Sequence, residues 1–161
     1  MELPDPAAAV HQELQARGET VASAESLTGG GLADLLSGQP GASSSYVGGV
    51  VSYATSVKES VLGVPADVLA SYGVVSAECA EAMAAGVRRL TGATWGISTT
   101  GVAGPTEQEG RPVGTVYLGV AGPSEMRSVE LALDGDRAAI RAQACLLALD
   151  QLRTALGRAP G

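Results

Sequence analysis

The amino-acid sequence predicts an α/β fold, a three-layer α/β/α sandwich around a mixed, mostly parallel sheet of about five strands. Short β-prone runs alternate with helix-like segments along the 161 residues, as is typical of layered α/β proteins. The last two β-prone runs are joined by a "GPSE" turn, which predicts a hairpin and therefore a mixed sheet. We expect one domain over residues 1–161, because this length is enough for one sizeable core.

The first part of the chain predicts two strands and the helices that flank them. Asp5 is expected to cap a first helix, with Pro6 at its first position and Gly18 after its end. The run "TVASAES" (20–26) is β-prone, and "LTGGGLADLLSG" then becomes helical. "YVGGVVSYA" (46–54) predicts the second strand, because its centre is almost continuously apolar.

The remaining elements are predicted in the same way. A short helical turn is expected around Lys58, a second short helix in "PADVLASYG", and a clear helix in "SAECAEAMAAGVRRLTG", which Ser76 opens. "TWGISTTGVAG" predicts a buried strand that runs into a loop. "VGTVYLGVAG" and "MRSVELAL" predict the hairpin, and Asp136 is expected to cap a long final helix.

Composition excludes several classes of function. The net charge of -7 argues against a nucleic-acid partner and against a membrane surface, so we expect neither. The start of the chain lacks the features of a signal peptide, and no stretch reaches the ~18 apolar residues of a membrane span. We therefore expect a soluble, cytoplasmic protein. With no Phe and one Trp, its core must be built from Ala, Val, Leu and Ile.

The chain offers few metal ligands. Cys79 and Cys145 lie far apart in helix-like segments, and we expect both to be buried free thiols. One histidine and scattered acidic residues give no ligand cluster, so the prediction is a site without metal or cofactor.

Three polar loops follow predicted strands: "AESLTGGG", "SYATSVKES" and "TTGVAGP". Ligands of open α/β sheets bind beyond the carboxyl ends of the strands, so these loops are expected to form the site. In the first loop, Gly29 and Gly30 let the backbone approach a ligand, and a helix N-terminus favours an anion or an oxyanion. Either Ser26 is a nucleophile beside such donors, or Ser26 or Thr28 only caps the helix.

The second loop contains Lys58, the only lysine among ten basic residues. The one histidine, His11, lies in the first predicted helix, which disfavours a Ser–His–Asp triad. A lysine with a lowered pKa can act as a base, whereas arginine stays protonated. Tyr53, five residues earlier, could orient or relay a proton. The alternatives are a solvated surface charge for Lys58 and core packing for Tyr53.

The third loop supplies Thr100 and Gly101, whose hydroxyl and N–H groups could bind a carbonyl or a phosphate, although an ordinary strand-to-loop transition explains them equally well. Glu107 and Glu109, further along, are expected to be solvated. Near the C-terminus, "GDRAAIR" places Arg137 and Arg141 on one helix face. They either provide a positive pocket for an anionic substrate or balance neighbouring aspartates.

Six segments occur in an order and spacing that resemble the CinA C-terminal domain family, and together they span residues 20–152. They are "AESLTGG", "PGASSSYVGGVVSYATSVKESVLGV", "GVVSAECAEAMAAGV", "TTGVAGP", "RPVGTVYLGV" and "GDRAAIR". Active members of this family are nicotinamide-nucleotide amidases. The resemblance therefore implies the three-layer fold, hydrolysis of the carboxamide of nicotinamide mononucleotide to nicotinate mononucleotide and ammonia, and a Ser/Lys mechanism without metal.

The resemblance also implies roles for individual residues. Ser26 matches the nucleophile, Lys58 the general base and Tyr53 the assisting tyrosine. Arg141 and the helix N-terminus near Gly30 are expected to hold the phosphate, and N–H groups of the glycine loop to stabilise the oxyanion. The residues expected to bind substrate are Thr28, Gly29, Gly30, Thr100, Gly101, Arg137 and Arg141. The implied partners are a small nucleotide substrate and further copies of the chain, in a dimer or a larger homo-oligomer.

Two departures from the family pattern bear on the substrate. After "AGP" the family usually has a pair of glycines, whereas this chain has Thr106 and Glu107, and the usual lysine of "KPVG" is Arg111. Two alternatives to the implied activity are therefore kept. One is a catalytically inactive nucleotide-binding module of the same fold, and the other is an amidase that acts on another small amide.

Overall fold

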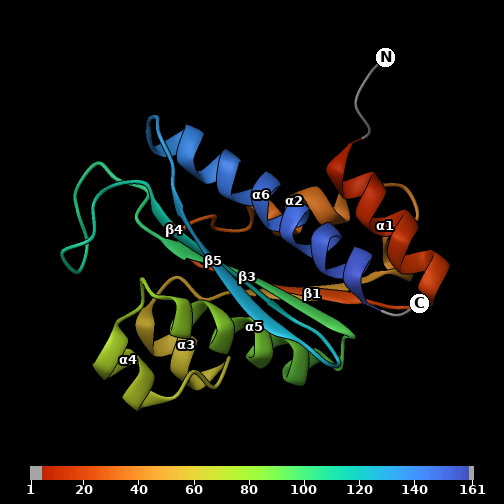
Figure 1. The fold of residues 1–161 in the computed structure, drawn as a ribbon, viewed down its shortest axis with the longest axis horizontal. Helices are drawn as coiled ribbons and strands as arrows, with labels where there is room; N and C mark the ends of the chain where they lie inside the picture. The colour runs from red at the N-terminus through yellow and green to blue at the C-terminus, as the bar shows by residue number, and fades with distance from the viewer. Residues whose placement is uncertain (1–4, 160–161) are drawn as a thin grey trace.

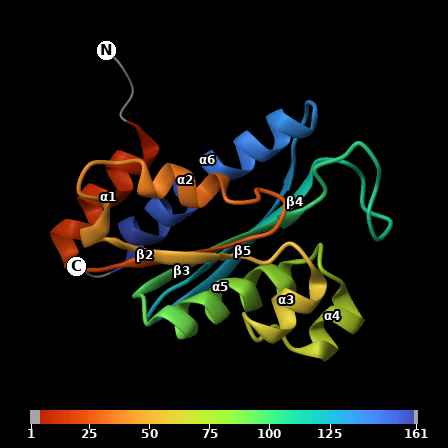
Figure 2. The same cartoon turned by 180° about the vertical axis from the view of Figure 1, so that it is seen from behind.

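The computed structural model describes residues 5–159, which form a five-stranded sheet with helices on both faces (Figure 1). The helices on one face are α1 (Pro6–Arg17), α2 (Gly31–Ser37) and α6 (Arg137–Arg158). Those on the other face are α3 (Thr55–Ser60), α4 (Ala66–Tyr72) and α5 (Ala77–Thr91). The view from behind in Figure 2 gives the same division into layers, which confirms the predicted three-layer sandwich.

The sheet is mixed, as predicted. Its strands, in spatial order, are β2 (Tyr46–Val51), β1 (Val21–Glu25), β3 (Trp95–Gly101), β4 (Thr115–Ala121) and β5 (Met126–Ala132). Strand β1 pairs in parallel with β2 and with β3, whereas β3–β4 and β4–β5 are antiparallel. A short 3₁₀ helix, η1 (Ala42–Ser44), precedes β2. Because β1, β2 and β3 are parallel, the loops that follow them leave the sheet at the same edge.

The predicted caps fix where three of the helices begin. The side chains of Asp5, Ser76 and Asp136 accept hydrogen bonds from backbone N–H groups in the first turns of α1, α5 and α6. Gly18 ends α1 in the left-handed region, at φ 66°, where a side chain would be strained. The cap at Asp136 matters for the site, because it sets the position of the first turn of α6.

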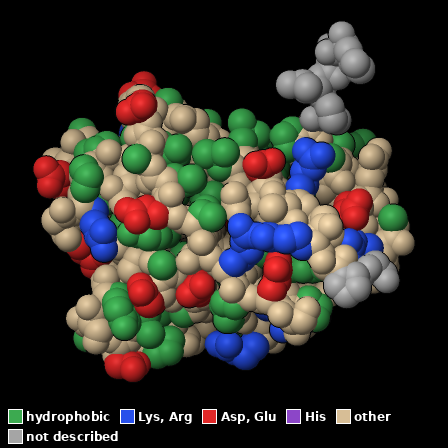
Figure 3. All heavy atoms as spheres, in the orientation of Figure 1, with side chains coloured by type: hydrophobic (Ala, Val, Ile, Leu, Met, Phe, Trp, Pro, Cys, Tyr) green, Lys and Arg blue, Asp and Glu red, His purple; other side chains and the backbone are tan. Residues whose placement is uncertain are grey.

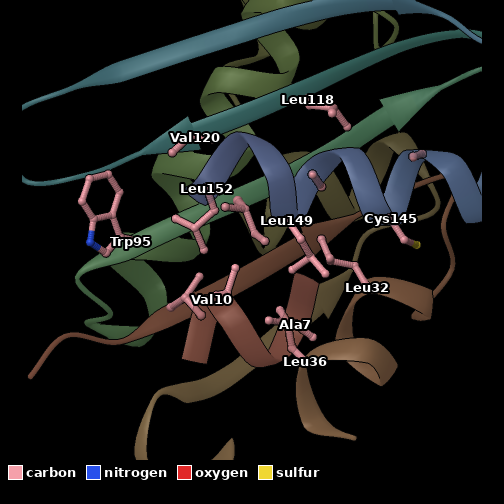
Figure 4. Close-up of a cluster of buried hydrophobic side chains, with 14 of the residues drawn as sticks. Ala7, Val10, Leu32, Leu36, Trp95, Leu118, Val120, Cys145, Leu149 and Leu152 are labelled. Carbon is pink, nitrogen blue, oxygen red and sulfur yellow. The ribbon is translucent and has the colours of Figure 1, made fainter. Parts of the chain in front are cut away.

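The larger part of the core lies between the sheet and helices α1, α2 and α6. Figure 4 shows Val10, Leu32, Trp95, Leu149 and Leu152 in this cluster, and all five are almost completely buried. Aliphatic side chains dominate it, as the absence of Phe from the sequence requires. Truncating one of its leucines to alanine should cost about 2–5 kcal/mol, through lost burial and the cavity left behind.

On the opposite face, α5 packs with its backbone almost against the sheet. A Cβ atom at Gly96 of β3 or Gly119 of β4 would collide with a backbone carbonyl of α5, from Ala84 and Ala80 respectively. Glycine is therefore required at both strand positions. This close packing holds the N-terminal turn of α5, which contains Cys79, next to the edge where the loops leave the sheet.

Other features away from that edge agree with the sequence. Cys79 and Cys145 are buried free thiols, as predicted. His11 is also buried, where its ring nitrogens contact Ser45 Oγ at 2.5 Å and the Leu36 carbonyl at 2.7 Å, so it joins α1 to the segments around it. Within residues 5–159, no helix is both long enough and apolar enough for a membrane span. On the face in Figure 3, basic and acidic groups are interspersed rather than gathered by sign.

Candidate active site

A pocket of about 310 Å³ lies at the edge of the sheet where the loops after β1, β2 and β3 meet. The sequence-predicted residues that line it are Ser26, Tyr53, Lys58, Thr100, Gly101 and Arg137. They come from four separate segments of the chain. The parallel strands bring three of these segments together, and the start of α6 supplies the fourth.

Ser26 comes directly after β1, and its backbone continues the parallel pairing. Its N–H group donates to the Thr99 carbonyl of β3 at 3.0 Å. The residue is half-buried at the floor of the pocket, so its hydroxyl is fixed by the sheet and still accessible from the pocket. A serine held in this way has the geometry that a nucleophile requires.

Lys58 reaches Ser26 from α3. Its Nζ atom lies 2.8 Å from Ser26 Oγ, 2.6 Å from the Ser52 carbonyl oxygen and 3.3 Å from the Tyr53 carbonyl oxygen. The side chain is buried, with 1% of its surface exposed. Carbonyl oxygens can only accept hydrogen bonds, so two N–H groups of Lys58 are directed at the backbone and the third direction faces Ser26.

The surroundings of Lys58 favour its neutral form. Burial lowers the pKa of Lys58 from its ordinary value of 10.5, and the charges of the Cys79 thiolate, where it forms, and of the Glu109 carboxylate oppose this only in part. Burial also raises the pKa of the Cys79 thiol to about 11, so this thiol is neutral at pH 7. Within residues 5–159 no carboxylate forms an ion pair with Lys58, so its cationic form would be buried without a counterion.

Glu25, the last residue of β1, is a buried carboxylate with a different task. It accepts hydrogen bonds from Thr28 Oγ1 at 2.6 Å and from the N–H groups of Leu32 and Ala33 at 2.8 and 3.0 Å. These N–H groups belong to the first turn of α2. Two N–H groups at the N-terminus of α2 are therefore already bonded to a side chain of the protein itself, and phosphate binding at this helix end stays a prediction.

The glycine loop lies beside the pocket rather than in its wall. Thr28 is buried and contacts Glu25 and Thr99 Oγ1, the latter at 2.7 Å. Thr28, Gly29 and Gly30 do not line the pocket that contains Ser26. The N–H of Gly29 is used by the Ser26 carbonyl at 3.1 Å, so this loop is held by local hydrogen bonds. These three predicted positions lie in the Ser26 loop outside the lining of this pocket, and their contact with a substrate stays a prediction.

Arg137 and Arg141 were predicted together, but the structure separates them. Arg137 lines the pocket and donates to Tyr53 Oη at 3.0 Å and to the Gly104 carbonyl at 2.6 Å. Arg141, one turn later, donates to the carbonyls of Leu27 and Thr28 at 2.9 and 3.2 Å and does not line this pocket. Of the two arginines, only Arg137 lines the pocket that contains Ser26.

Tyr53 is 61% exposed and lines the pocket, so it is not part of the core. Its hydroxyl contacts Arg137, and its backbone carbonyl contacts Lys58. Thr100 lines the same pocket, but its hydroxyl donates to the Val74 carbonyl at 2.7 Å. The hydroxyl proton of Thr100 is therefore already donated to the backbone.

Backbone donors are available on another wall of the pocket. Leu27, Ala103 and Gly104 line it, and across the described part of the chain their N–H groups have no hydrogen-bond acceptor. The sequence had pointed to the glycines after Ser26 for this role. Among the residues that line the pocket, N–H groups without an acceptor within residues 5–159 are found instead in the residue directly after Ser26 and in the loop after β3.

The long loop between β3 and β4 closes one side of the pocket. Glu109 has a left-handed backbone, φ 53°, and its carboxylate accepts from the N–H groups of Val74 and Val75 at 3.1 and 2.9 Å. Glu109 is exposed, as expected, but the two amides before α5 also hold its carboxylate in place. Glu107 is exposed as expected, yet together with Thr106 it lines the pocket.

Two contributions to the site were missed by sequence reasoning. The Ser52 carbonyl positions Lys58, and a backbone group carries no signal in the sequence. Glu25 lies five residues before Gly30, the N-cap residue of α2, so its hydrogen bonds to the N–H groups of Leu32 and Ala33 are not part of a local capping pattern. Within the described segment, no group of three or more His, Cys, Asp or Glu side chains is placed to hold a metal ion.

The fold and the site together define a class of protein. It is a three-layer α/β/α domain in which a buried lysine is hydrogen-bonded to a serine at the carboxyl ends of parallel strands. The chain belongs to the CinA family, because residues 4–156 match the model of the CinA C-terminal domain. A CinA-like protein of Anaeromyxobacter dehalogenans (strain 2CP-1) is 53% identical over 156 residues, covering 96% of this chain and 38% of that protein.

Other relatives agree with this assignment. A CinA-like protein of Frankia casuarinae is 52% identical over 144 residues, covering 89% of this chain and 33% of that protein. The crystal structure of the competence damage-inducible protein A (ComA) from Klebsiella pneumoniae superposes with a TM-score of 0.94 at 34% identity, covering 97% of this chain and 98% of the other. The chain thus spans about a third of the length of the two CinA-like proteins and nearly all of this solved structure.

Proposed function

We propose that this chain hydrolyses the carboxamide of nicotinamide mononucleotide, giving nicotinate mononucleotide and ammonia in the salvage of pyridine nucleotides. The observation that carries the proposal is the buried Nζ of Lys58, 2.8 Å from Ser26 Oγ and hydrogen-bonded otherwise to two backbone carbonyls. In neutral Lys58, the two N–H groups point at these carbonyls and the lone pair faces Ser26. The lysine can then accept the proton of the serine hydroxyl.

The first half of the reaction is acylation. Ser26 Oγ attacks the carboxamide carbon while Lys58 Nζ takes the hydroxyl proton, which gives a tetrahedral oxyanion. The N–H groups of Leu27 and Ala103, which have no acceptor among the described residues, are suited to stabilise this oxyanion. Lys58 then donates the proton to the amide nitrogen, the C–N bond breaks, and ammonia leaves behind an ester on Ser26.

The second half is hydrolysis of that ester. Lys58, neutral again, takes a proton from a water molecule as the water oxygen attacks the ester carbonyl. The second tetrahedral intermediate collapses, the bond to Ser26 Oγ breaks, and the proton on Lys58 returns to the serine. One amide and one water are consumed, and one carboxylic acid and one ammonia are formed.

The polar groups at the mouth of the pocket fit a nucleotide. Arg137 is held in place by two neutral acceptors, Tyr53 Oη and the Gly104 carbonyl, so its positive charge is not cancelled by a carboxylate. We assign the phosphate of the substrate to Arg137. Arg141 supports the Ser26 loop through the Leu27 and Thr28 carbonyls, and we assign it a positioning role.

Ammonia release tests the proposal directly. Purified wild-type protein is incubated with nicotinamide mononucleotide or with nicotinamide, beside the Ser26→Ala variant. We expect ammonia only from the wild type with the nucleotide. Nucleotide binding without ammonia release would contradict the amidase and support the nucleotide-binding module. Release from a different small amide, but not from the nucleotide, would support the other alternative, for which Thr106 and Glu107 in the pocket wall are the motivating observation.

A further inference from the structure

The mouth of the pocket carries two opposite charges that do not neutralise each other. Arg137 and Glu107 both line it, and both are exposed. Among residues 5–159, neither side chain forms an ion pair, and Glu107 has no hydrogen-bond partner either. Arg137 is oriented by neutral oxygen acceptors instead. Opposite charges that share a pocket and stay unpaired are suited to a ligand that itself carries both signs of charge.

The loop that carries Glu107 is anchored. Two residues later, the Glu109 carboxylate binds the N–H groups of Val74 and Val75, and Gly73 leaves room for it, because a Cβ there would lie 2.7 Å from its oxygens. The loop is thereby tied to the segment before α5, which forms another wall of the same pocket through Val74. Glu107 is therefore held at the pocket mouth by its neighbour rather than by a bond of its own.

We propose that Glu107 is a specificity-determining residue that faces the cationic ring of the substrate while Arg137 binds its phosphate. This inference rests on the proposed function, since a pyridinium nucleotide has a permanent positive charge in the ring that bears the carboxamide. The ring nitrogen is two bonds away from the carbon that bears that group. When the carboxamide lies at Ser26, the positive charge must therefore lie inside the same pocket. A carboxylate in the pocket wall selects for that charge.

The reduced nucleotide is a matched probe for ring charge. Dihydronicotinamide mononucleotide has the same carboxamide, ribose and phosphate, but its ring is neutral. Binding is measured by calorimetry in the Ser26→Ala background, because turnover would also report the different reactivity of the two amides. The variants are Glu107→Gln and, as a control, Glu59→Gln, which removes an exposed carboxylate beside Lys58 that does not line the pocket.

We expect the oxidised nucleotide to bind about fivefold more tightly than the reduced one, because this ratio corresponds to the free energy of one partly exposed ion pair. In Glu107→Gln this ratio should fall to about one, mainly through weaker binding of the oxidised form. In Glu59→Gln the ratio should stay as it is in the background. Raising the salt concentration should reduce the ratio in the background and leave it unchanged in Glu107→Gln.

Several results would overturn the inference. Equal weakening of both forms by Glu107→Gln would mean that Glu107 contacts the ribose or only shapes the loop. Equal strengthening would mean that it repels the phosphate, and an unchanged ratio would mean that it does not sense the ring. Binding of neither form would also overturn it. Ammonia release by the wild type tests the Ser26–Lys58 chemistry separately. Release of ammonia together with an affinity ratio that Glu107→Gln leaves unchanged would refute this inference alone. A ratio that changes in Glu107→Gln, without ammonia release by the wild type, would refute only the amidase.

Discussion

Charged side chains around Ser26 form two groups that differ in how their hydrogen-bonding capacity is used. Glu25 and Arg141 bind the backbone of the loop after β1, at the N-terminus of α2 and at the Leu27 and Thr28 carbonyls. Lys58 and Arg137 line the pocket and are oriented by neutral oxygens, so part of each group is left for a ligand. We infer that the first group shapes the site and that the second group takes part in the reaction.

Replacing Lys58 by arginine should have the largest effect of the changes that test these two groups. Lys58→Arg keeps a positive charge, but guanidinium stays protonated and cannot accept the Ser26 proton. We expect kcat to fall by about 10³-fold or more. Ammonia release under substrate saturation gives the number, and the circular dichroism spectrum of the variant checks that the fold is retained. Near-normal turnover in Lys58→Arg would remove Lys58 from the role of base.

Glu25→Gln tests the other group, through stability rather than chemistry. The amide places a donor among the Thr28 hydroxyl and the N–H groups of Leu32 and Ala33, where the carboxylate only accepts. We expect the free energy of unfolding to fall by about 2–3 kcal/mol, because hydrogen bonds to a buried charge are lost. Urea denaturation measures this.

Glu107→Gln is the matched control for Glu25→Gln, since the chemical change is the same. Glu107 is exposed and has no hydrogen-bond partner among residues 5–159, so its replacement should change the free energy of unfolding by no more than about 0.5 kcal/mol. Similar losses of unfolding free energy in the two variants would show that the buried hydrogen bonds of Glu25 contribute no more to stability than the exposed side chain of Glu107.

The two arginines allow the comparison within one helix. Arg137→Met should raise KM for the nucleotide about tenfold, with little effect on stability, because a charge-assisted contact to phosphate is lost. Arg141→Met should instead lower the free energy of unfolding by about 1–2 kcal/mol, because two backbone carbonyls in the Ser26 loop lose their donor. Steady-state kinetics and urea denaturation on both variants separate these outcomes, and a KM effect confined to Arg141→Met would reverse the assignment.

Much of the fold could be predicted from the sequence, because its signals are local. Asp5, Ser76 and Asp136 cap helices where the sequence places them, and the two adjacent β-prone runs form the predicted hairpin. The meeting of Ser26 and Lys58 also followed, since both come after strands that proved to be parallel neighbours. The local pattern alone decides the caps and the hairpin, whereas the meeting of Ser26 and Lys58 also depends on the parallel pairing of β1 with β2.

The remaining site residues could not be assigned in this way, because their roles depend on long-range partners. The local sequence does not distinguish Arg137 from Arg141, which lie one turn apart. Their long-range partners do, because Arg137 donates to the Tyr53 hydroxyl and Arg141 to the Leu27 carbonyl. Likewise, Glu107 and Glu109 differ only because the loop folds back on the amides before α5. The glycine loop was expected in the pocket because glycines let the backbone approach a ligand, and the local sequence contains no sign that Glu25 binds the N-terminus of α2.

The smallest expected effect is on the pH dependence of kcat/KM. Only neutral Lys58 can accept the proton, and burial lowers the pKa of Lys58, so kcat/KM should rise with pH along a limb that lies below pH 10.5.

The charge of Glu109 raises the pKa of Lys58, against the effect of burial. Glu109→Gln removes this charge, so the limb should move to lower pH, whereas Glu107→Gln should leave it in place. A loop that is merely loosened by Glu109→Gln would lower kcat/KM at every pH without moving the limb, so pH profiles of the two variants distinguish an electrostatic effect of the anchored carboxylate from a structural one.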